Sequence, residues 1–542
     1  MHHPREPGQA IRPVSMNLNA VLERLSLLKE EIKAQASQFA QIIKQVKTAG
    51  GWNEPLRQRA DTISEKMDGL HEELHRLVGE AETLLAAQGI TIPSEQRPEY
   101  EKRWWKKDLT PEAVPPGPVN LDESLENGLS QLVARLPKEW WREQQDLRGK
   151  LGDDHLVQPL VLYGNMIPEK IPGNIHWFAY ALMLSSDHLA KRDSFDVYRG
   201  ARMVPLIGAL CQSLQSLSGV KGGLAKSDEL PHIPSEHVES RIHELLVAAR
   251  NAEAGRDVEF LSAGTTKTPD LRVHDVVFPT VIECKRQSQL SSYEHSELNR
   301  VQEVFAILCK SRLSRGLIGS LEVIFRSEIR EVPVSEVVEA ALLCTGTLSL
   351  ASHNELSWGS VGFSPLSPSY ELPEETRIYG PAFMKHLFGW DGRTADYDGI
   401  CAVVSNAKSV RLGRAELPFC LKWRVDADQA LEGKARHVVR LLAEAVQQVP
   451  EGECGIIYIA YEDSHRAAVA DKRTQRIMDL AGTFELRKPW VMVPKIVVGR
   501  LFPDALEEGR PDLIESSVPL LAEGWEDFGD FFPDLVYTYR GR

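Results

Sequence analysis

The stretch TPDLRVHDVVFPTVIECKR, residues 268–286, decides the fold of the region around it. It holds two apolar runs, and the second ends in Glu283 and Lys285, which do not belong in a buried strand unless something pairs with them. Side chains of a strand alternate between its faces, so Glu283 and Lys285 share one face while Ile282 and Cys284 point into the other layer. Two charges on one face of an apolar strand predict a functional site.

A second carboxylate precedes this pair. Asp270 follows a proline, and its separation from Glu283 suits two adjacent antiparallel strands joined by a loop near residues 275–279. Such a hairpin would bring the two carboxylates together, and they would repel each other unless a cation lay between them. Hard oxygen ligands favour Mg²⁺ or Mn²⁺. Lys285 beside them can stabilise an attacking hydroxide or the charge that develops on a phosphoryl group.

The flanking segments predict a small mixed sheet covered by helices. A helical run, SEHVESRIHELLVAARNAEAG, ends at Gly255 and is followed by three strand-like runs, DVEFL, PDLRVHDVVF and TVIECKR. A second helical run, ELNRVQEVFAILCKSRL, and a further strand, GSLEVIFRS, complete the order α-β-β-β-α-β.

In these residues and this order, the segment 235–327 resembles the PD-(D/E)XK, or restriction-endonuclease-like, nuclease superfamily. Pro269-Asp270 is similar to the PD of that family, and Glu283-Cys284-Lys285 to its E-X-K. The resemblance implies that Lys285 positions the nucleophilic water, and it implies the following metal ligands: Asp270, Glu283 and the backbone carbonyl of Cys284. Gln287 lies where many relatives carry a further polar site residue.

The resemblance also implies a glutamate from the first helix. The ending HELLVAARNAEAG is similar to the E-x-x-x-A…G ending of the family, which assigns Glu244 to that role. On a helical wheel, however, Glu239 lies nearer the edge of the apolar stripe than Glu244 does. The spacing to Gly255 favours Glu244, and Glu239 remains the alternative.

The rest of the chain predicts a multidomain α/β plus α protein. Residues 17–87 carry two heptad runs and predict an antiparallel coiled-coil hairpin, which either binds a partner or a second copy of the chain, or packs on its own chain. A proline-rich linker over 88–120 leads to a helical domain over 121–230. The nuclease-like domain covers 235–350, and an α/β accessory domain covers 352–542.

Two features of the accessory domain concern function. Asp398 with Lys422 faintly repeats the nuclease layout, but Cys420 stands where a metal-binding glutamate would be needed, so such a repeat would be metal-free. The acidic, aromatic tail, residues 525–542, predicts a docked C-terminus, with occupation of a nucleic-acid groove as the alternative.

Composition limits the classes of function. No apolar run approaches the roughly 18 residues that span a bilayer, and the start lacks a secretory signal, so we expect a cytoplasmic protein without membrane contact. The seven cysteines form no CxxC pair, which fits reduced thiols. No Walker A motif occurs, so we expect no ATP bound by this chain. The net charge of −14 argues against indiscriminate coating of nucleic acid.

These observations predict a Mg²⁺-dependent (or Mn²⁺-dependent) endonuclease that acts on DNA, by analogy in prokaryotic restriction or anti-phage defence. The competing interpretation is a non-catalytic scaffold that keeps a nuclease-like fold for binding nucleic acid or protein. Its basis is the length of sequence outside the nuclease-like segment and the overall acidity.

Overall fold

The computed structural model divides the chain into two units, residues 1–101 and 102–542. In the first unit the structure describes only isolated positions between 24 and 73, so the predicted coiled-coil hairpin lies outside the described residues. In the second unit it describes residues 104–106, 121–151, 161–163, 171–192, 195–262, 268–274, 276, 280–287, 291–315, 318–344, 352–367, 369–371, 388, 397–404, 414–450, 453–462, 467–481, 492–505, 511–522 and 531–537.

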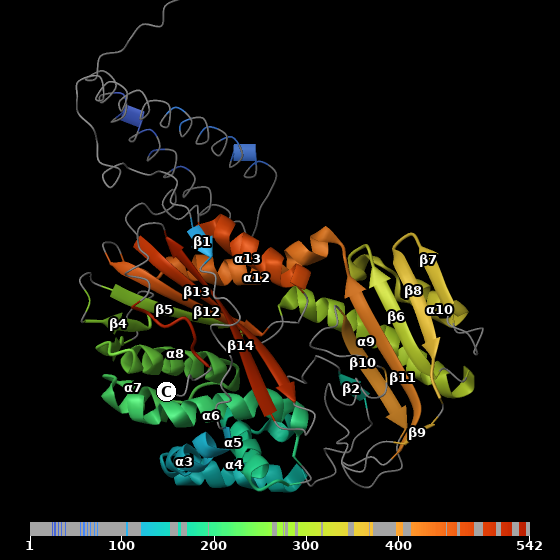
Figure 1. Ribbon diagram of the computed structural model, residues 1–542, viewed down its shortest axis with the longest axis horizontal. Helices are drawn as coiled ribbons and strands as arrows, with labels where there is room; N and C mark the ends of the chain where they lie inside the picture. Colours follow the sequence, from blue (N-terminus) through green and yellow to red (C-terminus); the bar gives the residue numbers. More distant parts are fainter. Residues whose placement is uncertain are drawn as a thin grey trace, which may run out of the picture. The chain divides into compact units, whose positions relative to one another are not determined.

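The second unit is a mixed α/β structure with two mixed sheets (Figure 1). The first sheet has the strand order β1-β14-β13-β12-β5-β4-β3. Its strands are β1 (Trp104–Lys106), β3 (Val258–Phe260), β4 (Leu271–Val273), β5 (Thr280–Gln287), β12 (Cys454–Glu462), β13 (Met492–Ala505) and β14 (Pro511–Ala522). β3, β4 and β5 pair antiparallel, whereas β5, β12 and β13 run parallel.

Helices cover both faces of the first sheet (Figure 1). One apolar cluster joins Ile282 of β5 and Ile456 of β12 to the helices α3 (Leu121–Ala134), α5 (Trp177–Leu189), α6 (Val197–Gly219) and α8 (Ser235–Glu253). The opposite cluster joins Val281 and Ile457 to α12 (Asp428–Val446) and α13 (Ala467–Ala481). The alternation of these neighbours between two cores follows from the two-residue period of a strand.

α8 ends where the sequence predicts it. The helix closes at Glu253, and Gly255 just beyond it has a φ of 82°, a left-handed conformation that favours glycine. The turn then leads into β3, the strand at the edge of the first sheet. Two further helices, α4 (Lys138–Leu151) and α7 (Gly223–Asp228), complete this side of the unit, together with the short 3₁₀ turn Pro172–Asn174.

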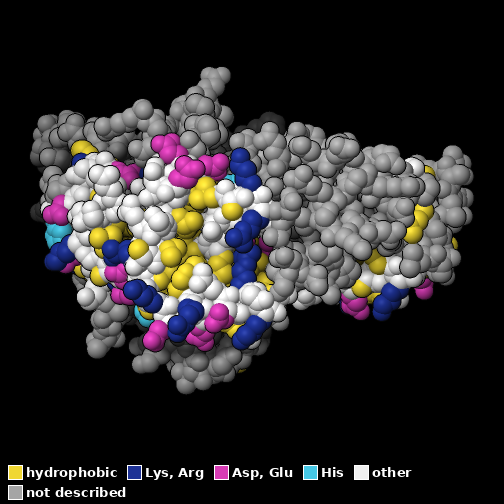
Figure 2. Space-filling view, turned by 90° about the horizontal axis from the view of Figure 1, so that it is seen from below, with side chains coloured by type: hydrophobic (Ala, Val, Ile, Leu, Met, Phe, Trp, Pro, Cys, Tyr) yellow, Lys and Arg dark blue, Asp and Glu magenta, His cyan; other side chains and the backbone are white. Residues whose placement is uncertain are grey.

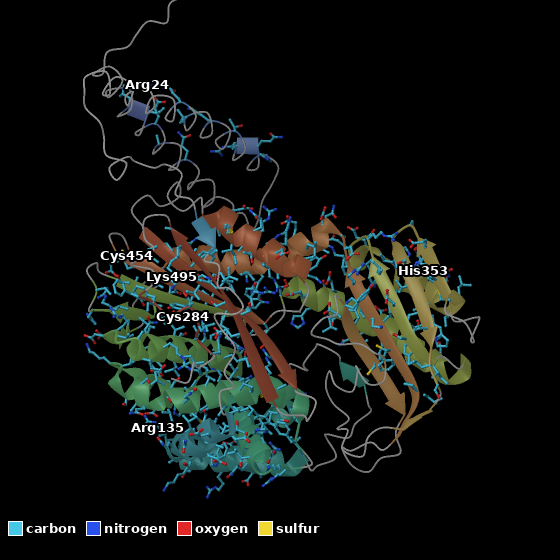
Figure 3. All side chains as sticks on the ribbon, in the orientation of Figure 1. Arg24, Arg135, Cys284, His353, Cys454 and Lys495 are labelled. Atoms are coloured by element: carbon cyan, nitrogen blue, oxygen red, sulfur yellow. The ribbon has the colours of Figure 1, made fainter. Side chains whose placement is uncertain are left out.

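The second sheet has the order β2-β10-β11-β6-β8-β7, with β9 also paired to β11. Its strands are β2 (Val161–Tyr163), β6 (Gly319–Phe325), β7 (Ser352–Leu356), β8 (Gly359–Pro365), β9 (Ser369–Glu371), β10 (Asp398–Val404) and β11 (Arg414–Val425). An apolar cluster packs it against α9 (Ser292–Arg315), the 3₁₀ turn Ile329–Glu331 and α10 (Val334–Cys344). Figure 3 shows Cys284, Cys454 and Lys495 in the first sheet and His353 in the second.

The fourth strand of the predicted core is corrected by this topology. GSLEVIF, which forms β6, was expected in the same sheet as TVIECKR, but it pairs with β11 and β8 in the second sheet. The parallel neighbour of β5 is β12, from the region predicted as a separate accessory domain. Both candidate strands are apolar and both follow a helix, so the pattern alone does not distinguish them. The segment that holds β6 to β11 is therefore an insertion between β5 and α12.

Ion pairs close the neck of this insertion. Lys434 of α12 lies 2.7 Å from Glu297 of α9, and both side chains are buried. Arg473 of α13 lies 2.7 Å from Glu294, also on α9. Gly433 packs so closely on the ring of Tyr293 that an added Cβ would lie 2.7 Å from it. The start and the end of the insertion are thus held together.

The structure also describes parts of the predicted linker and of the predicted accessory domain. β1 lies within the predicted linker and pairs antiparallel with β14. Asp398 and Lys422 lie on the neighbouring strands β10 and β11, and Cys420 is buried opposite Cys401. All seven cysteines are free thiols. Among the described residues, no helix is long and apolar enough to cross a membrane.

Replacing Ile456 tests the central place of β12. This side chain is fully buried between β5 and β13, so Ile456→Ala should lower the free energy of unfolding by about 2–5 kcal/mol, measured by chemical denaturation. Leu343→Ala is the control, because that side chain is 74% exposed and its loss should change stability by at most about 0.5 kcal/mol. Equal effects of the two changes would contradict the buried position of β12.

Candidate functional site

The two carboxylates of the opening stretch lie where β4 and β5 part. Leu271 pairs with Ile282 at the end of β4, so Asp270 and Glu283 come one position beyond the last pair. The Asp270 Oδ2 accepts a hydrogen bond of 2.8 Å from the backbone N–H of Cys284, where no strand partner competes for that donor. The antiparallel pairing predicted from the spacing of the two acids is confirmed.

Glu283 is a buried carboxylate held by two donors. Its side chain is 1% exposed, and its Oε1 accepts hydrogen bonds from the Lys285 Nζ and the Gln448 Nε2. Its Oε2 is buried and has no hydrogen-bond partner. Burial raises the pKa of Glu283 to about 8, with a further rise from Asp270 that Lys285 partly offsets. Loss of the proton from this carboxyl is therefore less favourable than from an exposed glutamate.

Glu244 of α8 belongs to the same group. Burial and the neighbouring Asp270 raise its pKa to about 7, and Arg241 lies 3.2 Å from its Oε2. The pKa of Asp270 is also raised by burial. Burial lowers the pKa of Lys285, but the ion pair with Glu283 outweighs this effect and the net change is upward. Three acids and one lysine thus influence one another at one end of β4.

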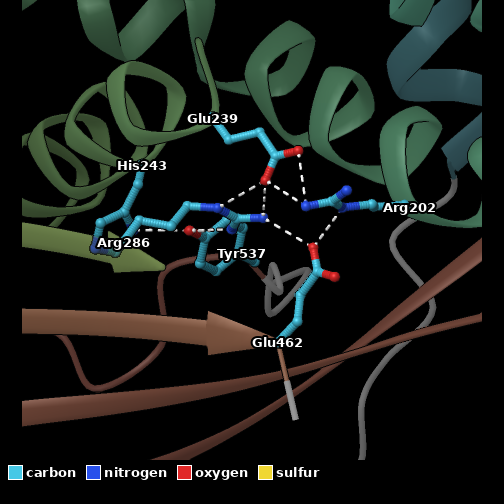
Figure 4. A network of polar contacts seen from close by, with 6 residues as sticks. All are labelled: Arg202, Glu239, His243, Arg286, Glu462 and Tyr537. Carbon is cyan, nitrogen blue, oxygen red and sulfur yellow. Dashed lines mark hydrogen bonds and ion pairs between the residues drawn. The ribbon is translucent and has the colours of Figure 1, made fainter. Parts of the chain in front are cut away.

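Glu239, the alternative helix glutamate, lies in a different group of charges (Figure 4). Its carboxylate accepts a hydrogen bond of 2.9 Å from Arg286 and lies 3.2 Å from Arg202 of α6. Arg202 also donates to Glu462 at the end of β12, at 2.6 Å. Because Arg286 is next to Lys285 on β5, it points into the opposite layer. The structure thus places Glu244, and not Glu239, beside Asp270.

The C-terminal segment completes this second group (Figure 4). The Tyr537 hydroxyl accepts a hydrogen bond of 2.8 Å from Arg286 and lies 2.8 Å from the Nδ1 of His243. Burial and Arg286 lower the pKa of His243 to about 3. The imidazole is therefore neutral, and its Nδ1 can accept the proton of Tyr537. His243 and Arg286 are the chain neighbours of Glu244 and Lys285.

Residues 531–537 are docked on the first sheet, as predicted for the tail. Glu515 of β14 accepts hydrogen bonds from the backbone N–H groups of Val536 and Tyr537, at 2.9 and 2.8 Å. Lys495 of β13 donates to the Phe532 carbonyl at 2.6 Å. Phe532 and Val536 are each 2% exposed in the core beside α8. Glu515 and Lys495 thus supply the backbone of the segment with partners inside the core.

The remaining predicted site residues lie on β5. Gln287 is buried at the end of the strand, opposite Tyr461 of β12 and on the face of Glu283 and Lys285. The Cys284 side chain is buried in the other layer, and burial raises the pKa of its thiol well above the ordinary value. Its backbone is the part that touches the group, through the N–H that binds Asp270.

The oxygen atoms of these acids are of the type that binds a hard divalent cation. Asp270, Glu244 and Glu283 are close enough to influence one another's pKa, and Glu283 Oε2 has no hydrogen-bond partner, which leaves an oxygen open to a positive charge. In the part of the chain that the structure describes, however, no three His, Cys, Asp or Glu side chains are arranged to hold a metal ion. Binding of an ion would therefore require the three acids to move closer together, while Glu283 Oε2 is free to contact it.

Three further residues near the acids were not predicted from the sequence. Gln448, which follows α12, reaches Glu283 from the far side of the insertion. Lys226 and Arg241, together with Lys285, partly offset the rise in the pKa values of Asp270 and Glu244. None of the three belongs to a spacing pattern, and Gln448 becomes a neighbour only through the pairing of β5 with β12.

Comparison of the chain with protein-family models, curated proteins and solved structures gives no match.

The raised pKa of Glu283 predicts a pH-dependent stability. Its ordinary value is 4.5 and the folded value is about 8, so the folded chain binds more protons between these values and loses stability as the pH rises through them. Glu283→Gln stays neutral. In EDTA it should therefore gain stability over the parent chain, little at about pH 5 and most above about pH 8.

Unfolding by denaturant across that pH range measures the gain. Glu355→Gln is the control, because hydrogen bonds from Arg326 and His353 lower the pKa of Glu355, and no gain with rising pH is expected there. A gain of Glu283→Gln that does not grow with pH would show that Glu283 is ionised in the folded chain.

Arg286 should contribute strongly to stability. Arg286→Met leaves the buried Glu239 with one cation fewer and removes a donor to Tyr537, so we expect a loss of about 3–5 kcal/mol in the free energy of unfolding. Arg326→Met is the matched control, because the pair of Arg326 with Glu355 is more than half exposed and should contribute little to stability. Similar losses in both variants would refute the role of the buried pair.

Proposed function

We propose that this chain is a metal-dependent phosphodiesterase, an endonuclease that acts on DNA. The observation that carries the proposal is the meeting of Asp270, Glu283, Lys285 and Glu244 where β4 and β5 part. Acids with raised pKa values beside a lysine are typical of sites that handle a cation and a developing negative charge.

The topology supports a restriction-endonuclease-like core. The order α8-β3-β4-β5-α12-β12 gives an antiparallel hairpin followed by a helix and a parallel strand. It is the order expected from the resemblance to the PD-(D/E)XK superfamily, with α12 and β12 in the places first assigned to α9 and β6. The insertion then adds the second sheet to the core.

Each polar group has a role in this proposal. Asp270, Glu283 and the Cys284 carbonyl would hold Mg²⁺ or Mn²⁺, with Glu244 beside them. The ion would supply a Lewis acid and lower the pKa of a bound water. Lys285, whose side chain is 21% exposed, would turn its ammonium from Glu283 toward the phosphoryl oxygens and stabilise their charge. Gln287 would line the same face of β5.

Although the chain has a net charge of −14, part of its surface is basic and could bind a polyanion. Figure 2 shows one side of the molecule, where a row of Lys and Arg side chains borders an apolar area. Locally basic surface can attract DNA while acidic surface elsewhere limits indiscriminate binding.

Further parts of the proposal are a cytoplasmic location, a role in prokaryotic restriction or anti-phage defence, and a partner or second copy bound through the N-terminal region. We expect no membrane contact and no ATP bound by this chain.

Replacing Lys285 tests the proposed chemistry. Lys285→Met keeps most of the apolar volume of the side chain and removes its charge, so cleavage should fall by about two orders of magnitude or more. The assay measures cleavage of plasmid, linear duplex, single-stranded DNA and RNA in Mg²⁺ and in EDTA. Asp270→Asn should lose metal affinity as well as activity, because it removes a ligand.

Thermal unfolding separates these effects from a loss of fold. Lys285→Met should keep the melting temperature at neutral pH near that of the parent chain, since Glu283, with its raised pKa, can take up a proton when the cation is removed. The proposal fails if the parent chain cuts none of the substrates in Mg²⁺ or Mn²⁺, or if both variants cut as well as it does.

A non-catalytic scaffold is the second candidate. The observation in its favour is that Glu283 is engaged by Lys285 and Gln448 while the described acids are not arranged around a common point. Titration calorimetry with Mn²⁺ distinguishes the two candidates. An endonuclease should show a Mn²⁺ site that disappears in Asp270→Ala, whereas a scaffold should show none.

A further inference from the structure

Two cations stand beside the acids without belonging to the predicted motif. Arg241, on α8, has its Nη1 3.2 Å from the Glu244 Oε2 and 3.8 Å from the Glu229 Oε2. Lys226, on α7, has its Nζ 3.1 Å from the same Glu229 oxygen. One carboxylate oxygen is thus shared by an ammonium and a guanidinium at the border of the acidic group.

The exposed fractions of Glu229, Lys226 and Arg241 indicate which of the three side chains can move away most easily. Glu229 is 45% exposed, whereas Lys226 and Arg241 are each 22% exposed. Ion pairs with an exposed carboxylate contribute little free energy, so Glu229 can turn to solvent at small cost. Because Lys226 and Arg241 are less exposed than Glu229, we expect their charges to stay in place when Glu229 turns to solvent.

Arg241 also has a donor to spare. Its Nε is buried and lacks a hydrogen-bond partner, while its Nη1 is directed to carboxylates. A guanidinium can present two parallel N–H groups to one tetrahedral anion, and an ammonium adds a point charge. A phosphodiester carries one negative charge, like the Glu229 carboxylate that now contacts both cations. Its oxygens would also offer an acceptor to the Arg241 Nε.

The two cations face the acidic group as well as Glu229. Arg241 contacts Glu244 directly, and both cations partly offset the rise in the pKa values of Asp270 and Glu244. An anion bound by Lys226 and Arg241 would therefore lie next to the group that is proposed to cut. On a nucleic acid, a phosphate one or a few positions from the scissile bond meets this requirement.

We propose that Lys226 and Arg241 form a binding site for a backbone phosphate next to the scissile one, and that Glu229 occupies this site when no nucleic acid is bound. The site rests on the proposed function for its substrate class. It assigns the cations a positioning role, because a phosphate fixed beside the acids sets the register of the strand against Lys285. Glu229 then acts as an internal competitor for the substrate.

Binding of a fluorescently labelled DNA duplex to the full chain tests this site. Fluorescence anisotropy is measured in EDTA, so that cleavage does not occur, across a series of KCl concentrations. Lys226→Gln and Arg241→Gln should each weaken binding roughly 3- to 10-fold, and each should reduce the slope of log K against log salt concentration by about 1. Glu229→Gln should tighten binding about 2- to 5-fold, because it removes the competitor and a repelling charge.

Matched variants control for net charge. Lys310→Gln removes an exposed cation from α9, and Glu339→Gln removes an exposed anion from α10, both of which pack on the second sheet. Both should leave the affinity within about 2-fold of the parent chain, since a screened distant charge has little effect. Circular dichroism and thermal unfolding confirm that every variant is folded.

The outcomes separate this site from the proposed chemistry. Unchanged affinity and salt slope in both cation variants, weaker binding by Glu229→Gln, or the absence of any DNA binding would overturn the phosphate site. If the chain cuts DNA in an Asp270-dependent manner while these variants bind normally, the nuclease proposal stands and the phosphate site falls. If binding depends on both cations but no cutting occurs, the phosphate site stands and the nuclease proposal falls.

Discussion

β5 imposes the constraint on which the rest of the first sheet depends. The strand is buried on both faces and paired on both edges, yet its last five residues include four polar or charged side chains, namely Glu283, Lys285, Arg286 and Gln287. A charge in such a place is costly unless it finds a partner. The elements around β5 supply these partners from distant parts of the chain: Gln448 after α12, Glu239 of α8, Glu462 of β12 and Tyr537 of the C-terminal segment.

The alternation of β5 divides this task between two layers. Glu283 and Lys285 face the side of α12, where the charges are only partly compensated and the acids keep raised pKa values. Arg286 faces the side of α8, where ion pairs surround it. The fully paired group stabilises the strand, and the poorly paired group lies one residue away. A rigid, well-packed strand holds the side chains of a site in a fixed geometry, which suits chemistry.

The local part of this design could be predicted from the sequence. The two-residue period placed Glu283 and Lys285 on one face, and the spacing to Asp270 predicted the antiparallel hairpin that β4 and β5 form. The partner of the other edge of β5 could not be predicted, because β6 and β12 have similar apolar patterns and only three-dimensional packing distinguishes them. On α8, the apolar stripe identified a buried glutamate, Glu239, whose arginine partners come from α6 and β5. Glu244, which lies beside Asp270, is off that stripe. The apolar pattern of α8 therefore identified the buried glutamate and not the one near the site.

The closed neck of the insertion has a consequence for biosynthesis. β5 leaves the ribosome long before β12 exists, and until then one edge of an apolar strand has no partner, a state that favours association with other chains. Folding of the second sheet in the meantime would bring α9 and α12 together through Glu297 and Lys434, and so shorten the loop that must close before β12 can dock. The insertion would then serve as an internal folding aid for the strand that precedes it. Chains truncated before α12 would keep the exposed edge permanently and would be recovered mainly as aggregates.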